Sequence, residues 1–306
     1  MSDVLNFDNK NDYDALVESS IIDLRSKAQF SERHIKYSCN IESASLESRL
    51  HELPESRQIV SIIGEQSDLL FAGDFLTSKG YKILFQIEAT SFFKTYKELD
   101  WFNTGKVSQR LWKPSSAVEI FKEKYVQLIN TNKDVSKKSL KGLDLACGAG
   151  RDSIFMAVDG WDMTAVDYMP SALLRVNSLA ENNQCKIKTI ELDLEKIELN
   201  DDESPFLPTW KGYYDLVIVS RYLHRPLLKH IDRLLKPSGF IVYQTFLEGC
   251  EKFGSPKNPR YLLKYGELAN AFSGYKIYYD ELERLSDNRP TNAFIAQKQN
   301  AIDILG

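Results

Sequence analysis

Short apolar runs alternate with amphipathic segments through the second half of this chain. The apolar runs predict strands at 142–147, 163–166, 186–192, 214–220, 240–245, 275–279 and 293–296. Between them, apolar side chains recur at helical spacing and predict helices at 152–158, 170–182, 227–235 and 265–272. Another helix is expected after Ser115 and Ser116, which can cap its first turn. This alternation predicts an α/β fold with a parallel, doubly wound sheet.

A smaller set of strands and helices comes before this region. Strands are predicted at 21–24, 59–63 and 81–85, and a helix at 67–78 should end at Gly80, because glycine favours a helix C-terminus. These elements predict a small α/β layer domain. The polar turn NTGK at 103–106 predicts the boundary, which gives two domains, 1–102 and 107–306. The polar run at 130–141 is expected to be a surface loop.

Composition and charge disfavour several classes of protein. The 306 residues are 43% hydrophobic and 27% charged, which provides enough apolar material for two buried cores. A formal net charge of −4 argues against nucleic acid as a partner, because nucleic-acid binders are usually basic. No C-x-x-C pair occurs, so neither a disulfide framework nor a zinc site is expected from the four cysteines, Cys39, Cys147, Cys185 and Cys250.

The sequence also bears on the expected cellular location. Its first residues, MSDVLNFDNKNDYD, are polar and acidic, so no signal peptide is expected. No apolar run approaches the ~20 residues that cross a bilayer, so we expect no membrane partner. Reduced thiols fit a reducing compartment, and we expect the protein in the cytoplasm, or in the cytoplasm and the nucleus.

A turn of small residues and a set of acids follow successive strands. In GLDLACGAGRDS, Gly148 and Gly150 let the backbone approach a ligand, and the next helix offers free N–H groups. Asp144 suits a ligand that carries an ammonium group. Asp167 ends the next strand, where it can accept hydrogen bonds from both ribose hydroxyls, and Asp193 follows the third strand, where it can accept from an adenine amino group. The acids therefore predict one adenosyl site at the carboxyl edge of the sheet.

A dinucleotide is the nearest rival ligand for this turn. It requires the pattern G-x-G-x-x-G, whereas here Ala146, Gly148 and Gly150 form the turn and Ser153 follows. The carboxylate of Asp144 would also repel a pyrophosphate. An ordinary strand-to-helix turn without a ligand is the other alternative, and the ordered set of acids argues against it.

With these motifs, residues 107–298 resemble a class I S-adenosylmethionine-dependent methyltransferase. The run DLACGAGRD is similar to that family's first motif, with Ala146 in place of its first glycine, and YDLVIVSRYLHR and LLKPSGFIVYQTF fit later motifs. The similarity is greatest to the small-molecule branch around tellurite and thiopurine resistance methyltransferases. It implies a seven-stranded Rossmann-like sheet with an antiparallel last strand. It also implies S-adenosylmethionine as the cofactor, with these binding residues: Asp144, Ala146, Gly148, Gly150, Arg151, Asp167, Tyr168, Asp193, Leu194, Ser220, Arg110 and Trp112.

Methyl transfer from a sulfonium mainly requires alignment of donor and acceptor. A base is needed only if the acceptor must lose a proton. The segment 220–225 should face the methyl group, so Tyr222 and His224 are the candidate catalytic residues; alternatively, they form a structural cluster at a helix start. This segment lacks the D/N-P-P-Y-like tetrapeptide of nucleic-acid and protein amide or amine methyltransferases, which argues against methylation of adenine N6 or of glutamine.

A long segment at 245–268, rich in glycine and proline, follows the fifth strand. Such a segment over an active face is typical of a lid, so its polar residues are candidates for binding the substrate. They are Asn258, Arg260 and Glu267; alternatively, the segment is only a structural crossing. His224 and His230 are six residues apart, which fits no common metal spacing, so no metal is expected.

The first domain resembles a rhodanese-like domain. Its matching residues lie in IIDLRSKAQFSERHIKYSCNI and are Asp23, Arg25, Phe30, His34 and Ile35. Active sulfurtransferases open the loop after the later strand with a nucleophilic cysteine, but no cysteine lies between Cys39 and Cys147 here. The resemblance therefore implies a catalytically inactive domain, which serves as a docking module for a protein partner or as a stabilising cap.

Three hypotheses about function remain. The leading one is an active methyltransferase that modifies an unidentified acceptor, more readily a small molecule than a protein or tRNA. The second is a regulatory protein that binds S-adenosylmethionine or a partner without turnover. The third, an active sulfurtransferase, is disfavoured by the missing cysteine.

Overall fold

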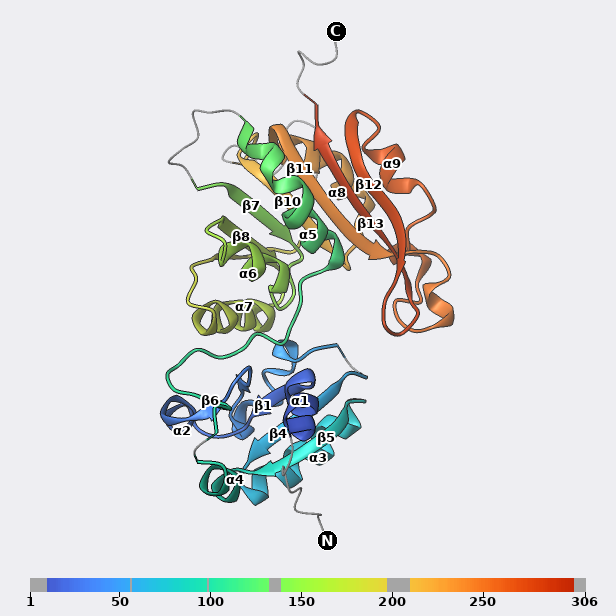
Figure 1. Ribbon diagram of the computed structural model, residues 1–306. Coiled ribbons are helices and arrows are strands. Elements are labelled where there is room, and N and C mark those ends of the chain that lie inside the picture. The colour runs from blue at the N-terminus through green and yellow to red at the C-terminus, as the bar shows by residue number, and fades with distance from the viewer. Residues whose placement is uncertain (1–9, 56, 98, 132–138, 197–209, 300–306) are drawn as a thin grey trace. The chain divides into compact units, whose positions relative to one another are not determined.

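The computed structural model describes residues 10–55, 57–97, 99–131, 139–196 and 210–299 (Figure 1). The chain divides into two compact units, residues 1–112 and residues 113–306. This division falls after Trp112, whereas the polar turn in the sequence placed the boundary at 103–106. Of the surface loop predicted at 130–141, residues 132–138 lie outside the described part of the chain.

The first unit is built on a four-stranded parallel sheet with the order β3-β1-β4-β5. Its strands are β1 (Ser20–Asp23), β3 (Cys39–Asn40), β4 (Ile59–Gly64) and β5 (Lys82–Glu88), so the strands predicted near 21, 59 and 81 are confirmed. A short antiparallel pair, β2 (His34–Ile35) with β6 (Phe102–Asn103), lies apart from this sheet. The helices are α1 (Lys10–Glu18), α2 (Lys27–Glu32), α3 (Gln66–Ser78) and α4 (Ala89–Thr95).

Apolar side chains cover both faces of this small sheet. One cluster joins β1 and β4 to α3 through side chains such as Ile22, Ile62 and Leu76. A second cluster joins the opposite face to α1 and α4 through Leu16 and Phe92. Helices on both faces are the usual arrangement for a parallel sheet, because neither face can be left to water.

The residues that carry the rhodanese-like resemblance form interior contacts. Asp23 and Arg25 form a buried ion pair with an N–O distance of 2.6 Å, and the Arg25 guanidinium stacks over the ring of Phe93. The rings of Phe30 and His34 stack with their centroids 3.8 Å apart, and the His34 Nδ1 lies 2.8 Å from the Phe30 carbonyl oxygen. The resemblance therefore rests on side chains that form an ion pair and ring contacts in the interior of the unit.

The second unit contains a seven-stranded sheet with the order β12-β13-β11-β10-β7-β8-β9. The strands are β7 (Lys141–Leu145), β8 (Asp162–Asp167), β9 (Lys188–Glu191), β10 (Tyr214–Ser220), β11 (Leu235–Phe246), β12 (Tyr275–Arg284) and β13 (Pro290–Lys298). Neighbouring strands from β9 to β11 run parallel, whereas β13 is antiparallel to both β11 and β12. The chain order reverses between β7 and β10, which is where such sheets bind ligands at their carboxyl edge.

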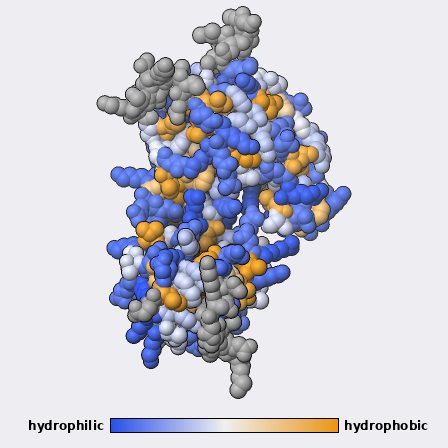
Figure 2. Space-filling view, viewed as in Figure 1, coloured by the Kyte–Doolittle hydropathy of each residue, from blue (hydrophilic) through white to orange (hydrophobic). Residues whose placement is uncertain are grey.

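Helices pack on both faces of this sheet (Figure 1). One face carries α5 (Ser116–Ile120), α6 (Arg151–Ala157) and α7 (Pro170–Asn182). A π turn (Phe121–Tyr125) and a 3₁₀ turn (Val126–Thr131) extend α5. The opposite face carries α8 (Arg225–Leu234) and α9 (Glu267–Ala271), whose apolar side chains share one cluster with β7, β10 and β11. Figure 2 shows mostly hydrophilic residues over the visible face, with apolar residues in scattered groups.

Several predicted ends in this unit were wrong, including those of β13, which was expected at 293–296 and spans Pro290–Lys298. The helix expected at 227–235 ends at Leu234, because Leu235 pairs with Tyr214 and begins β11, which was expected only at 240–245. The strand β12 continues to Arg284 rather than ending near 279, because it stays paired with β13. Among the described residues, no helix has the length and apolar character needed to cross a membrane.

Candidate active site

The turn after β7 is shaped by three residues with left-handed backbone conformations. Ala146, Gly148 and Gly150 have φ values of 56°, 56° and 78°. A Cβ at Gly150 would lie 2.7 Å from a methyl carbon of Val176, so no side chain fits there. A Cβ at Gly148 would meet no atom within 4 Å, so this side of the turn faces open space. The turn is therefore close-packed on its inner side and open where a ligand can approach.

Asp167, at the end of β8, holds this turn in place. Its carboxylate accepts a hydrogen bond from the backbone N–H of Gly148 and another from that of Met169, each at 2.9 Å. Because one carboxylate bonds to both loops, the tips of β7 and β8 are fixed to each other. The structure thus brings together two of the groups that the sequence assigned to one site.

Asp144 lies inside β7 with 2% of its surface exposed, and the Ser153 hydroxyl donates a hydrogen bond to its carboxylate. Burial raises the pKa of Asp144 well above its usual range, and the nearby charges of Asp152 and Asp167 add to this effect. A positive charge bound beside Asp144 would favour the ionised form of its carboxyl group. This group of carboxyl side chains therefore suits a cationic ligand.

Asp152, in the first turn of α6, connects three elements around this turn. Its carboxylate accepts from the backbone N–H of Ser115 at 2.6 Å and from the Ser220 hydroxyl at 2.5 Å. Ser115 precedes α5 and Ser220 ends β10, so the starts of two helices and the end of a strand meet here. The predicted capping by Ser115 takes a different form, because its side chain forms no capping hydrogen bond to α5.

Asp193 lies two residues beyond β9, on the same edge of the sheet. The backbone N–H of Leu192 donates to the Asp167 carbonyl oxygen at 3.0 Å, which ties this segment to β8. The ammonium group of Lys196 lies 3.0 Å from the Asp193 carboxylate and lowers the pKa of that acid. The neighbouring Leu194 is buried in the main apolar cluster of the unit.

Four other residues predicted to bind the cofactor lie in two different units. Arg151 is the first residue of α6, directly after the turn, and Tyr168 is exposed after β8. Arg110 and Trp112 belong to the first unit, where the Arg110 guanidinium lies 4.8 Å from the Trp112 ring centre. A role for these residues in binding stays a prediction.

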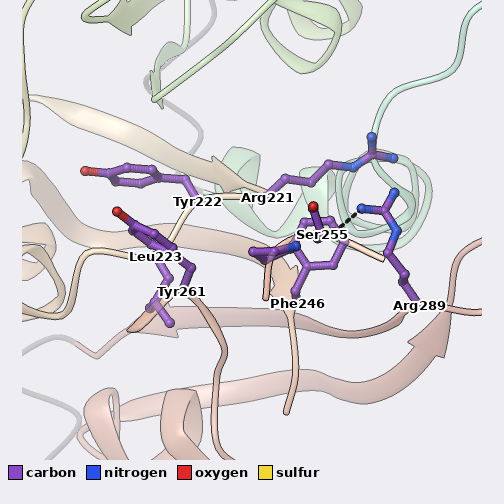
Figure 3. A pocket seen from close by; sticks show the side chains of 8 residues that line it. Arg221, Tyr222, Leu223, Phe246, Ser255, Tyr261 and Arg289 are labelled. Atoms are coloured by element: carbon purple, nitrogen blue, oxygen red, sulfur yellow. Dashed lines mark hydrogen bonds between the residues drawn. The ribbon is translucent and has the colours of Figure 1, made fainter. Parts of the chain in front are cut away.

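A pocket with a volume of about 400 Å³ opens directly after Ser220 (Figure 3). It lies at the carboxyl ends of β10 and β11, in the second unit. Its lining comes from the last residue of β11, from two short segments after β10 and β11, from Tyr261 and from the turn before β13. It consists of Arg221, Tyr222, Leu223, Phe246, Ser255, Pro256, Tyr261 and Arg289. One of the two candidate catalytic residues, Tyr222, is therefore part of the pocket wall.

Tyr222 and His224 differ in their preferred protonation. The Tyr222 hydroxyl is buried without a hydrogen-bond partner in the part of the chain that the structure describes. Burial, together with the charges of Glu195 and Asp193, raises the pKa of Tyr222, so its hydroxyl stays protonated. His224 precedes α8 with 8% of its surface exposed, and burial lowers its pKa, so its imidazole stays neutral near pH 7.

The three residues predicted to bind substrate all take part in contacts within the protein. Asn258 accepts a hydrogen bond from the backbone N–H of Arg260 at 3.0 Å. Arg260 forms an ion pair with Glu195 at 2.9 Å, which joins the segment 245–268 to the loop after β9. Both carboxylate oxygens of Glu267 accept from Arg225, at 2.6 and 2.9 Å. Substrate binding by these residues stays a prediction.

Several residues of this site were absent from the sequence-based set. Asp152 had a local signal, since acidic residues favour the first turn of a helix, but its bond to Ser220 depends on the fold. Arg221 lies in the segment expected to face the methyl group, yet only its neighbours were selected. Arg289 comes from a turn 68 positions later in the chain, and no local pattern marks it.

The cysteine at the glycine turn is not activated as a nucleophile. Cys147 lies within the turn, and burial together with the charges of Asp144 and Asp167 raises its pKa, which keeps the thiol protonated. Within the described ranges, no group of three histidine, cysteine or acidic side chains is arranged to hold a metal ion.

The chain is similar to several known proteins. A family model described as "Tellurite resistance protein TehB" matches residues 117–286, more than half of the chain. An uncharacterised protein of Schizosaccharomyces pombe is 23% identical, over 92% of this chain and 94% of that protein. The ubiquinone biosynthesis O-methyltransferase of Rickettsia prowazekii is 26% identical, over 49% of this chain and 58% of its own length. The crystal structure of TehB from Haemophilus influenzae covers 60% of this chain and 67% of its own, with 18% identity and a TM-score of 0.43.

Proposed function

The chain belongs to the TehB family of S-adenosylmethionine-dependent methyltransferases, and from this premise we propose that it methylates a small organic molecule bound beside the end of β10. Methyl transfer from S-adenosylmethionine is the activity of the family, and this cofactor is the methyl donor. The identity of the acceptor is the part that this proposal adds. Its main support is the pocket that opens next to Ser220, within one residue of the contacts that fix the glycine turn.

The residues around the turn fit the donor. The open side of Gly148 leaves room for a ligand against the backbone, and the group of acids suits its positively charged ammonium and sulfonium centres. We assign the ribose hydroxyls to Asp167, the methionine ammonium to Asp144 and the adenine amino group to Asp193. When bound, S-adenosylmethionine supplies a methyl group on a cationic sulfur, which leaves as a neutral thioether once the acceptor atom attacks the methyl carbon.

The protein's own contribution is mainly alignment. Ser220 and Asp152 fix the end of β10 to the start of α6, so the two halves of the site keep a constant separation. We assign the acceptor's proton to His224, because its neutral imidazole can accept one. Tyr222, which stays protonated, acts as a hydrogen-bond donor that orients the acceptor rather than as a base.

Calorimetric titration with S-adenosylmethionine tests the assigned cofactor site. Removing the Asp167 carboxylate should weaken binding about 10- to 100-fold, because hydrogen bonds to a charged group contribute about 1.5–3 kcal/mol. Asp162 is a matched control, since it begins the same strand at the opposite edge and its carboxylate pairs with Lys141 at 3.2 Å. Equal affinity of the Asp167→Ala and Asp162→Ala proteins would refute the assignment.

We further propose that the first unit is a rhodanese-like module without sulfurtransferase activity. Its only cysteine, Cys39, is buried, and burial raises its pKa to about 11, so it is a poor nucleophile. The residues behind the resemblance serve the unit's interior, as the Asp23–Arg25 ion pair illustrates. A thiosulfate sulfurtransferase assay on the full chain should show no activity above that of a Cys39→Ser variant.

A further inference from the structure

The pocket beside Ser220 has an apolar wall and a cationic wall (Figure 3). In this view the rings of Tyr222 and Tyr261 lie on one side and the guanidinium groups of Arg221 and Arg289 on the other, and the charges of both arginines act on Asp287. Phe246 contributes an aromatic ring between these two sides. A ligand that fills this space would therefore meet aromatic surface along its body and positive charge at one end.

The two arginines differ in how far the protein already uses them. Arg289 donates to the Asp287 carboxylate at 2.8 Å and to the Ser255 carbonyl oxygen at 2.5 Å, and it lies over the ring of Phe246. The guanidinium of Arg221 is exposed and forms no hydrogen bond to any residue that the structure describes. Arg221 is thus the group with donors available to a ligand.

The charge at this end of the pocket is not fully balanced. The charges of both arginines act on the Asp287 carboxylate. Partial burial opposes its ionisation, but bonds from Arg289 and the charges of Arg289 and Arg221 lower its pKa, so it is ionised near neutral pH. The described residues that line the pocket include these two arginines and no acid, so the lining itself carries positive charge that an anionic ligand would balance.

The size of the pocket restricts the kind of anion. A volume of about 400 Å³ lies in the range of sites for small organic ligands, ~300–1,000 Å³. An inorganic oxyanion is only a few times larger than the ~30 Å³ of a water molecule, and it would leave the aromatic wall without contacts. The lining therefore fits an organic body of about the size of a substituted ring.

The backbone holds Arg221 in a defined place. Its φ of 55° lies in the left-handed region that few non-glycine residues adopt, and its N–H donates to the Gln244 carbonyl oxygen at 2.7 Å. Ser220, the residue before it, bonds to Asp152 beside the glycine turn. A strained conformation retained between the cofactor site and the pocket is typical of a functional position.

Building on the methyl transfer proposed above, we propose that this pocket selects an organic acid as the methyl acceptor. Its carboxylate binds the Arg221 guanidinium, and its flat apolar body lies between Tyr222, Tyr261 and Phe246. Arg289 contributes positive charge and shapes the pocket while it stays bonded to Asp287. The acceptor class is thus an aromatic or similarly flat carboxylate, rather than an inorganic oxyanion or a neutral molecule.

Matched pairs of probes test this proposal. Hydroxylated benzoates, such as 3,4-dihydroxybenzoate, are compared with the corresponding neutral benzamides and with selenite, by titration into the full chain and by release of S-adenosylhomocysteine. The acids should bind about tenfold more tightly than their amides, as expected for one charge-assisted hydrogen bond. Arg221→Gln should reduce the acids to the level of the amides, and Arg221→Lys should retain part of the preference.

The controls separate this proposal from the function on which it rests. Arg175→Gln, on α7 and outside the pocket lining, removes the same charge and should change nothing. Affinity for S-adenosylmethionine should stay within about twofold in the Arg221 variants, because its site uses other residues. Equal binding of acids and amides, a preference that survives Arg221→Gln, tighter binding of selenite, or no binding of any acid at millimolar concentration would each overturn the proposal. If the unaltered protein does not bind S-adenosylmethionine, that result would instead contradict the proposed function.

Discussion

Alanine at Gly150 should destabilise the second unit, whereas alanine at Gly148 should mainly weaken cofactor binding. The two glycines are two residues apart in one turn, and both have positive φ values. At Gly150 the added Cβ would lie 2.7 and 3.0 Å from the two methyl carbons of Val176, which is buried on α7. At Gly148 it would point into open space where we place the ligand.

The expected sizes follow from these contacts. A left-handed backbone costs an alanine about 1–2 kcal/mol, and relieving an overlap in a packed interior costs about 1–3 kcal/mol. Gly150→Ala should therefore lower the free energy of unfolding by about 2–5 kcal/mol. Gly148→Ala carries only the backbone cost of about 1–2 kcal/mol, but it should weaken S-adenosylmethionine binding about tenfold or more, equivalent to about 1.4 kcal/mol.

Urea unfolding gives the stability change, and hydrogen exchange of peptides from β7 and α6 locates it in the second unit. A cycle with Val176→Ala isolates most of the steric part, because alanine lacks the two methyl carbons that lie closest to the added Cβ but leaves the backbone strain unchanged. The reasoning is wrong if Gly150→Ala and Gly148→Ala cost the same stability, or if Val176→Ala brings no recovery in the double variant.

Three further predictions concern charged groups near the site. Arg260→Gln should change the free energy of unfolding by less than ~1 kcal/mol, because the ion pair of Arg260 with Glu195 is partly exposed. If the segment 245–268 is a lid, this variant should raise KM for the acceptor more than it lowers kcat. An unchanged KM would exclude a lid role for this segment. The raised pKa of Asp144 destabilises the ligand-free fold increasingly as pH rises above the unfolded value of ~3.9 towards the folded one. Asp144→Asn should therefore flatten the pH dependence of stability over that window, and it should also weaken the rise of S-adenosylmethionine affinity with pH; curves parallel to those of the unaltered protein would contradict this. Because the pKa of His224 is lowered, kcat/KM should fall only at pH values below the ordinary imidazole pKa of ~6.5. If the same fall at low pH persists in His224→Gln, another group causes it.

Local features explain which parts of the fold the sequence could predict. The helix α7 was predicted with both of its ends, because Pro170 favours the first turn and buried apolar residues such as Val176 and Leu179 recur at helical spacing. The start of β11 at Leu235 could not be predicted, because its pairing partner Tyr214 lies on another strand. The short strands β2 and β6 depend in the same way on each other.

The site follows the same division. Asp144, Gly148 and Gly150 lie close together in the sequence, and their residue types already indicate a ligand-binding turn. Other contacts of the site connect residues that are far apart in the chain. The Gly148 N–H donates to Asp167, the Ser220 hydroxyl donates to Asp152, and Arg221 and Arg289 line the same pocket. Such contacts have no local pattern to reveal them.

Spacing over a few residues is enough to predict the alternation of strands and helices, the glycine turn and the acids at successive strand ends. The protonation states that the buried Asp144, Tyr222 and His224 favour, and the side chains that surround the pocket beside Ser220, depend instead on the folded arrangement. Burial and the distances between charges set these properties, and both arise only when distant segments pack together.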